Sequence, residues 1–177
     1  MGGEHVDIFV NHWPSRYGGE KRSAPGRYAA AEAARKKINE LMQEFPNDKI
    51  VLMGDLNDDP VNESVTKYLY AGGNVKDLQP GELYNPWVDF YKKGMGTLAY
   101  QDAWSLFDQI ILSQSWLDKK QTGFFFYQNH VFKKPYMIEN IGRYKGYPLR
   151  TYSGDTFQDG YSDHFPTYII LLKRLAH

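Results

Sequence analysis

The sequence predicts an α/β fold, and three consecutive segments near its start support that prediction. Residues 6–11, VDIFVN, form a short apolar run with β-branched and aromatic side chains, which is typical of a strand. An amphipathic segment follows, and a second apolar run, KIVLMGD at 49–55, comes directly after it. Strand, helix and strand in this order make a βαβ unit, so we expect two parallel strands in one sheet, joined by a right-handed crossover.

The first strand is predicted to be buried and to lead into a polar turn at residues 13–19. The helix is predicted from spacing, because its apolar residues recur at steps of three and four and so share one face. We expect it to lie between Pro25 and Pro46, since proline disrupts a helix interior. The apolar residues of this face are Ala31, Ala34, Ile38, Leu41 and Phe45.

The uninterrupted apolar run at 49–55 predicts a strand covered on both faces. Residues 61–70 can form a short helix, and the glycine, proline and asparagine content of residues 71–96 predicts a surface loop. The stretch 133–162 is too irregular for a repeat and too aromatic for a disordered linker. No boundary interrupts the chain, so we predict one domain over residues 1–177. Three further segments have strand composition: 106–112, 123–132 and 165–172.

Composition limits the classes of function. A chain of 177 residues with 42% hydrophobic content suits one domain with a substantial core. Lysine plus arginine and aspartate plus glutamate number 21 each, so the excess basicity of a strong, sequence-independent nucleic-acid binder is absent. The lack of cysteine excludes disulfides, thiolate zinc sites and a cysteine nucleophile, which leaves carboxylates, histidines and amides as metal ligands. No apolar run approaches the roughly 20 residues of a membrane span, so we expect a soluble chain.

Polar groups suited to hydrolysis follow the predicted strands, where ligands gather in α/β folds. The motif GDLN at 54–57 ends the second strand. Its glycine permits a sharp turn, Asp55 offers a carboxylate to a hard cation or a water, and Asn57 offers an amide to a phosphate oxygen. The alternative is an Asx-rich turn that only closes the strand.

The motif SDHFP at 162–166 places Asp163 and His164 just before the last strand. Adjacent side chains on an extended chain point in opposite directions, so these two cannot orient each other. A hydrolytic histidine needs an acceptor on its far nitrogen. Asp108, in the apolar segment FDQIIL, is the candidate, because a carboxylate buried there needs a partner. The alternative is that it caps a turn or pairs with a lysine.

His12 and Arg16 follow the first strand in the segment NHWPSR. Arginine can bind a phosphate through two parallel hydrogen bonds, and a histidine can donate to the same group. We therefore predict that Arg16 contacts substrate. The alternative is a loop whose polar residues surround a packed Trp13.

These motifs, in this order, resemble the endonuclease/exonuclease/phosphatase family, which includes pancreatic-type deoxyribonucleases and inositol polyphosphate phosphatases. The similarity covers residues 6–172 and consists of a strand ending in histidine, GDLN, an aspartate heading FDQIIL, and SDHFP before a final strand. It implies part of a deoxyribonuclease-like four-layer α/β/β/α sandwich. It also implies a hydrolase that cleaves phosphate esters by in-line attack of water and uses Mg²⁺ or Mn²⁺.

The resemblance further implies a role for each site residue. His164 would activate or protonate at the scissile phosphate, and Asp108 would orient it. Asp55 would position the attacking water or help to hold the metal. The full predicted set comprises the catalytic residues His164, Asp108, Asp55, Asn57 and His12, the metal ligands Asp163 and Asp55, and the substrate contacts Arg16 and Asn57.

Members of this family are usually longer, because an N-terminal half supplies a second sheet and a metal-binding glutamate. We therefore expect this chain to be a C-terminal fragment of the domain, with any signal peptide in the missing part. An apolar sheet face would then be exposed or covered by another chain. Loss of the glutamate weakens metal binding, so the activity of this chain alone stays open.

The substrate also stays open among DNA, RNA, inositol or sugar phosphates, a phospholipid headgroup and small phosphodiesters. Zero net charge disfavours long nucleic acids. The alternative of a different class is a catalytically incompetent fragment or a module that only binds a phosphate ligand.

Overall fold

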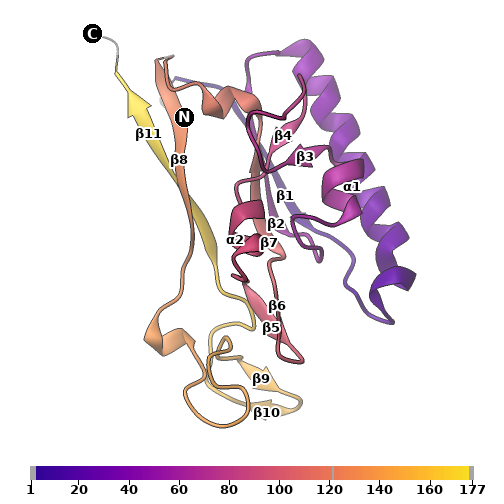
Figure 1. Ribbon diagram of the computed structural model, residues 1–177, viewed down its shortest axis with the longest axis vertical. Helices are drawn as coiled ribbons and strands as arrows, with labels where there is room; N and C mark the ends of the chain where they lie inside the picture. Colours follow the sequence, from indigo (N-terminus) through magenta and orange to yellow (C-terminus); the bar gives the residue numbers. More distant parts are fainter. Residues whose placement is uncertain (1–2, 121, 176–177) are drawn as a thin grey trace.

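The computed structural model describes residues 3–120 and 122–175, which form a mixed α/β fold around a five-stranded sheet (Figure 1). β1 and β2 are parallel, with Val6 beside Lys49 and His12 beside Asp55. β2 and β7 are antiparallel, with Asp55 opposite Asp108. The strand order is β1 (Val6–His12), β2 (Lys49–Asp55), β7 (Asp108–Leu112), β4 (Leu83–Tyr84) and β3 (Ala71–Gly72).

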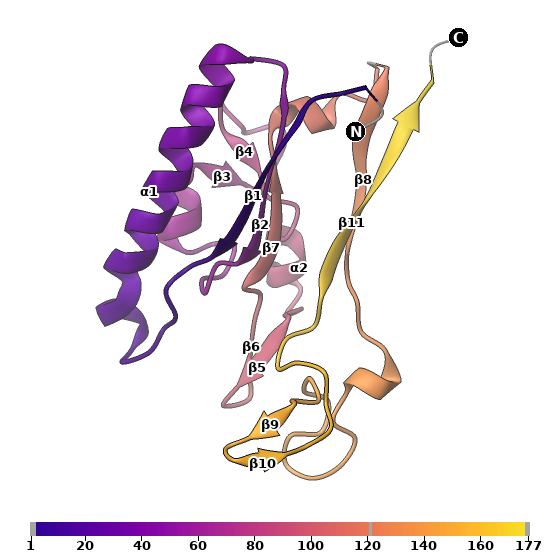
Figure 2. The same cartoon turned by 180° about the vertical axis from the view of Figure 1, so that it is seen from behind.

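Two layers cover opposite faces of this sheet, as Figures 1 and 2 show. The helix α1 (Glu20–Glu44) packs Ala31, Ala34 and Ile38 against Ile50 and Leu52 of β2. The antiparallel pair β8 (Gly123–Val131) and β11 (Thr167–Arg174) lies on the other side. The core there contains Val51, Trp87, Leu106, Ile110, Leu112 and Trp116, with Phe124, Phe126, Ile169 and Leu171 packed against it.

Short elements complete the fold, and several of them gather beyond the ends of β1 and β2 (Figure 2). None of the helices in the described residues is long and apolar enough to cross a bilayer. The short elements are a π-helical turn at Ser64–Tyr68, the helix α2 (Val88–Lys92), 3₁₀ turns at Gln114–Leu117 and Pro135–Met137, and the strands β5 (Leu98–Tyr100), β6 (Ala103–Ser105), β9 (Tyr152–Ser153) and β10 (Thr156–Phe157).

The predicted βαβ unit is confirmed, but the helix has different ends. It begins at Glu20 and contains Pro25, which was expected to precede it. Phe45 is the C-cap and is largely exposed, so it does not belong to the buried face. The first strand is also less buried than predicted, because Ile8 and Val10 are 59% and 76% exposed.

The prediction of a surface loop at 71–96 is wrong. This segment supplies β3, β4 and α2. The prediction failed because glycine and proline are frequent here and the two strands are only two residues long each. Trp87 is fully buried and donates its indole N–H to the backbone oxygen of Ile110 on β7. Burial of such a large ring next to the central strands makes the segment part of the core.

Gly54, the penultimate residue of β2, has a φ of +134°, which disfavours any other residue. A Cβ atom there would collide with the backbone carbonyl oxygen of Asn11 on β1. The close approach of the two strands therefore requires glycine, and it places Asp55 directly beside His12.

We predict that Gly54→Ala lowers the free energy of unfolding by about 2–4 kcal/mol, from backbone strain plus overpacking. Chemical denaturation would measure the loss. Gly146→Ala is the matched control, because Gly146 also has a positive φ, of +96°, but has open space where the Cβ would lie. Equal losses in the two variants would show that the collision with Asn11 costs nothing.

Candidate active site

Three polar side chains stand in a row across the ends of neighbouring strands. The register pairs His12 of β1 with Asp55 of β2, and Asp55 with Asp108 of β7. Paired residues on adjacent strands project from the same face of a sheet. Asp55 lies on the same face of β2 as Val51 and Met53, which pack towards β8 and β11, so the row lies on that face.

His164 reaches this row from the loop before β11. Its Nδ1 lies 2.8 Å from Oδ2 of Asp108 and 4.0 Å from Oδ2 of Asp55. The loop is fixed directly after the histidine, because Phe165 is buried and donates its backbone N–H to the oxygen of Thr97. Asp163 precedes the histidine and is exposed.

Electrostatics couple these groups. Burial by itself would lower the pKa of His164, but the hydrogen bond to Asp108 and the charges of Asp108, Asp55 and Asp163 outweigh it and raise that pKa. The pKa of Asp55 is also raised, first by burial and then by the charge of Asp108, although the backbone N–H of Asn57 and the two histidines oppose this. The site therefore favours a positive charge next to Asp55.

His12 completes the row at the sheet edge. Its Nε2 lies 3.7 Å from Oδ2 of Asp55, and 77% of its side chain is exposed. It is thus free to meet a ligand that approaches Asp55 from solvent.

Asn57 is buried behind Asp55 and has a φ of +50°. Its backbone N–H donates to Oδ1 of Asp55 at 2.9 Å, and its side-chain amide donates to the backbone oxygen of Trp13. An NH₂ group has two hydrogens, and this bond uses one of them. Asn57 therefore also stabilises the turn that the GDLN motif predicted.

The predicted role of Arg16 as a phosphate ligand does not match its surroundings. Its Nε donates to the backbone oxygen of Asn57 at 2.9 Å, and its guanidinium lies over the ring of Phe107. Carboxylate and amide oxygens of the protein hold the other nitrogens, so this charge is already compensated. Those partners are Glu20, Asp58, Asp59 and Asn62.

A cavity of about 360 Å³ near this loop was not predicted from the sequence. Trp104 of β6 connects the cavity with the loop that carries His164. The centroid of its ring lies 6.1 Å from that of Phe165, on which it stacks, and 5.9 Å from that of Tyr147. The sequence signal that could have indicated this cavity is the abundance of tyrosine in residues 133–162. The cavity is lined by Ala99, Tyr100, Gln101, Glu139, Arg143, Tyr144, Tyr147, Pro148, Leu149, Arg150, Ser153 and Gln158.

Known proteins of one family resemble the chain. The family model described as "Endonuclease/Exonuclease/phosphatase family" matches residues 1–173. A mannosyl-6-phosphatase of Bacteroides thetaiotaomicron is 20% identical, with a TM-score of 0.53, over 93% of this chain and 50% of that one. A humanized D. rerio TDP2 is 14% identical, with a TM-score of 0.54, over 98% and 57%. The chain thus spans about half the length of these structures, whose likeness establishes the fold. No curated protein matched it.

We predict that Asp108→Asn lowers the pKa of His164, because the substitution removes the anionic acceptor at Nδ1. In the wild-type chain the imidazole should stay protonated to a higher pH than the ordinary value of 6.5. An NMR titration that follows the His164 ring signals would measure both values. Asp163→Asn should lower the pKa less, since Asp163 contributes least to the shift. An unchanged titration in Asp108→Asn would contradict the coupling.

Proposed function

Because the chain belongs to the endonuclease/exonuclease/phosphatase family, we propose that it is the C-terminal part of a hydrolase that cleaves phosphate esters by in-line attack of water. The observation that carries this proposal is the convergence of His164, Asp108 and Asp55 at the ends of β2 and β7. A partly buried carboxylate that holds one imidazole nitrogen leaves the other nitrogen to exchange a proton with a ligand.

In this reaction His164 is the proton donor or acceptor at the scissile phosphate. Asp108 holds Nδ1, fixes the tautomer and stabilises the imidazolium, so that Nε2 is the nitrogen that meets substrate. Water attacks phosphorus and gives up a proton while the bond to the leaving oxygen breaks and that oxygen takes up a proton. His164 serves one of these two proton transfers, and solvent serves the other. Asp55 positions the attacking water, and His12 and Asn57 stabilise the charge on the phosphate oxygens.

The donor set at this site fits a hard divalent cation. Asp55 and Asp163 would hold Mg²⁺ or Mn²⁺, which neutralises charge on the phosphate and the leaving oxygen when bound. The carboxylate of Asp55 is only 23% exposed and faces the carboxylate of Asp108, so a cation would relieve their repulsion. Magnesium commonly uses one or two carboxylates and keeps several waters. We expect Asp55 and Asp163 to provide part of the coordination and an N-terminal half to provide the rest.

A small phosphorylated sugar is the substrate class that we favour. The matching Bacteroides structure is named for a sugar-phosphate substrate, and the net charge of zero disfavours long nucleic acids. The cavity beside Trp104 presents Arg143 and Arg150 together with several tyrosines. Arginine donates hydrogen bonds to hydroxyl oxygens, and tyrosine combines an apolar ring with a hydroxyl, so both suit the sugar part of such a substrate.

His164→Ala and Asp108→Ala should each lower turnover by about 10²–10⁴-fold, the usual contribution of a positioned acid or base. The assay is magnesium-dependent hydrolysis of a chromogenic phosphodiester and of a sugar phosphate. It is run on this chain and on a form extended at its N-terminus. Asp77→Ala, an exposed aspartate on another loop, is the control. Circular dichroism would verify that each variant keeps the fold.

Activity confined to the extended form would support a catalytic domain of which this chain is a part. Turnover of either variant near that of the wild type would remove the proposed mechanism. Inactivity of both forms on all substrates, combined with phosphate binding, would favour the binding module instead.

We also predict that the double variant Arg143→Ala/Arg150→Ala raises KM for a sugar phosphate by about 10-fold and leaves kcat nearly unchanged, because it removes binding contacts remote from the reacting atoms. Steady-state kinetics on the active form would measure both constants. Lys145→Ala is the matched control, since this cation lies between the two arginines in sequence but does not line the cavity. An unchanged KM would exclude the cavity from substrate binding.

A further inference from the structure

A second group of possible metal ligands lies at the opposite end of β1 and β2. His5 precedes β1, Asp7 is its second residue, and Asp48 precedes β2. Because Val6 pairs with Lys49, His5 and Asp48 are neighbours, and strand alternation puts His5 and Asp7 on one face. Seven residues separate His5 from His12, which is about 23 Å along a strand. The group is therefore distinct from the candidate active site.

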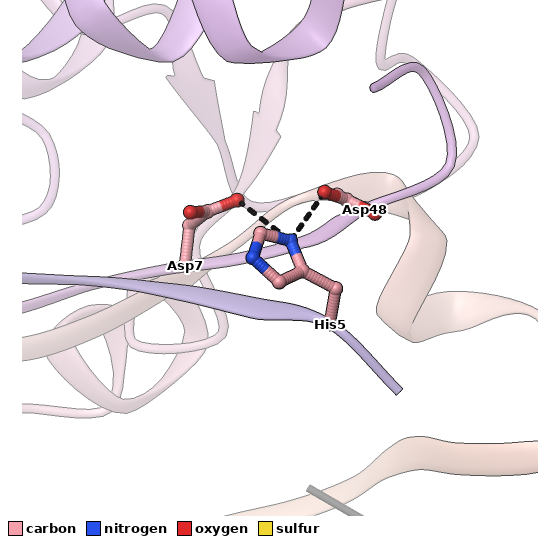
Figure 3. Close-up of side chains that lie close together, drawn as sticks. All are labelled: His5, Asp7 and Asp48. Atoms are coloured by element: carbon pink, nitrogen blue, oxygen red, sulfur yellow. Dashed lines mark hydrogen bonds and ion pairs between the residues drawn. The ribbon is translucent and has the colours of Figure 1, made fainter. Parts of the chain in front are cut away.

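The three side chains point toward one another, as Figure 3 shows. Nδ1 of His5 lies 2.5 Å from Oδ2 of Asp48 and 3.7 Å from Oδ2 of Asp7. All three ligand atoms lie within 4.8 Å of one another, and no other group of three or more such side chains in the described part of the chain meets this criterion. Tetrahedral zinc with bonds of about 2.0–2.1 Å separates its ligand atoms by roughly 3.3 Å. Small side-chain rotations would produce that spacing.

The oxygen of Asp7 supplies an independent reason to expect a cation. Oδ2 is buried and has no hydrogen-bond partner among the described residues. A buried carboxylate oxygen without a partner is costly, and a bound cation removes the cost. The nearest cationic group is the ring of His5, at 3.7 Å.

The end of α1 adds to this negative field. The helix ends at Glu44 and has no basic residue in its last turn, so its C-terminal dipole is not compensated from within the helix. The ring of the C-cap Phe45 contacts the ring of His5, which brings this helix end next to the cluster.

We propose that His5, Asp7 and Asp48 bind a divalent transition-metal ion, and that the ion is zinc. An imidazole nitrogen with two carboxylates suits zinc better than magnesium, and water would fill the fourth position. The side chain of His5 is 62% exposed, which leaves the ion a path from solvent. The ion would join the start of β1 to the turn between α1 and β2, so its role is to stabilise the sheet.

Zinc binding can be measured by titration calorimetry on the metal-free chain, with millimolar Mg²⁺ present to saturate sites that prefer magnesium. The wild type should bind one zinc ion, and zinc should raise its thermal midpoint. His5→Asn and Asp48→Asn keep a polar group at each position but should weaken zinc binding by more than about 10-fold. Asp77→Asn, an exposed aspartate outside the cluster, should bind as the wild type does.

Cobalt provides a second measurement on the same proteins. Co²⁺ bound at a four-coordinate site absorbs in the visible, so the wild type should develop a band that both cluster variants lack. Equal zinc affinity in the wild type and both variants would overturn the proposal. So would the absence of stoichiometric zinc binding to the wild type. Retained secondary structure in the variants would show that a lost site does not reflect unfolding.

Discussion

The arrangement of the candidate site depends on two buried aspartates that follow β2. Asp58 is almost fully buried, and its Oδ2 forms an ion pair with Arg27 of α1 at 2.8 Å and accepts a hydrogen bond from the hydroxyl of Ser64. Asp59 accepts the backbone N–H of Leu106 at 2.7 Å, just before β7. A buried carboxylate is stable only with such partners, and loss of one partner would leave an uncompensated charge. This network therefore joins the end of β2 to α1 and to β7.

The same network includes Arg16. The arginine binds both aspartates from the loop after β1, so its charge stabilises the fold at the point where three strands end. With the strand ends held together, Asp55 and Asp108 keep their register. His164 needs a separate anchor, which Phe165 and the oxygen of Thr97 supply. The loop that carries His164 and the ends of the strands are therefore held in place by different interactions.

The sequence predicted the long, strongly patterned elements well. The runs at 49–55 and 123–132 were found nearly to the residue. For 49–55 the reason is that a continuous apolar run of that length suits a strand between two layers. The strands of two or three residues were missed, because pattern arguments need longer windows. The partners of Arg16 were missed for another reason: residue type indicates charge, whereas only the folded chain shows which opposite charge lies nearby. The cluster at His5 was likewise hidden, since its members are 43 residues apart in sequence.

The exposed part of β1 ties the candidate site to whatever covers this face. Ile8 and Val10 alternate on the strand with Asp7 and Phe9, so they share their face with His12. Two neighbouring apolar side chains this exposed are typical of an interface, and the chain spans about half of its structural relatives. A segment or partner that buries Ile8 and Val10 would also border His12 and, beside it, Asp55.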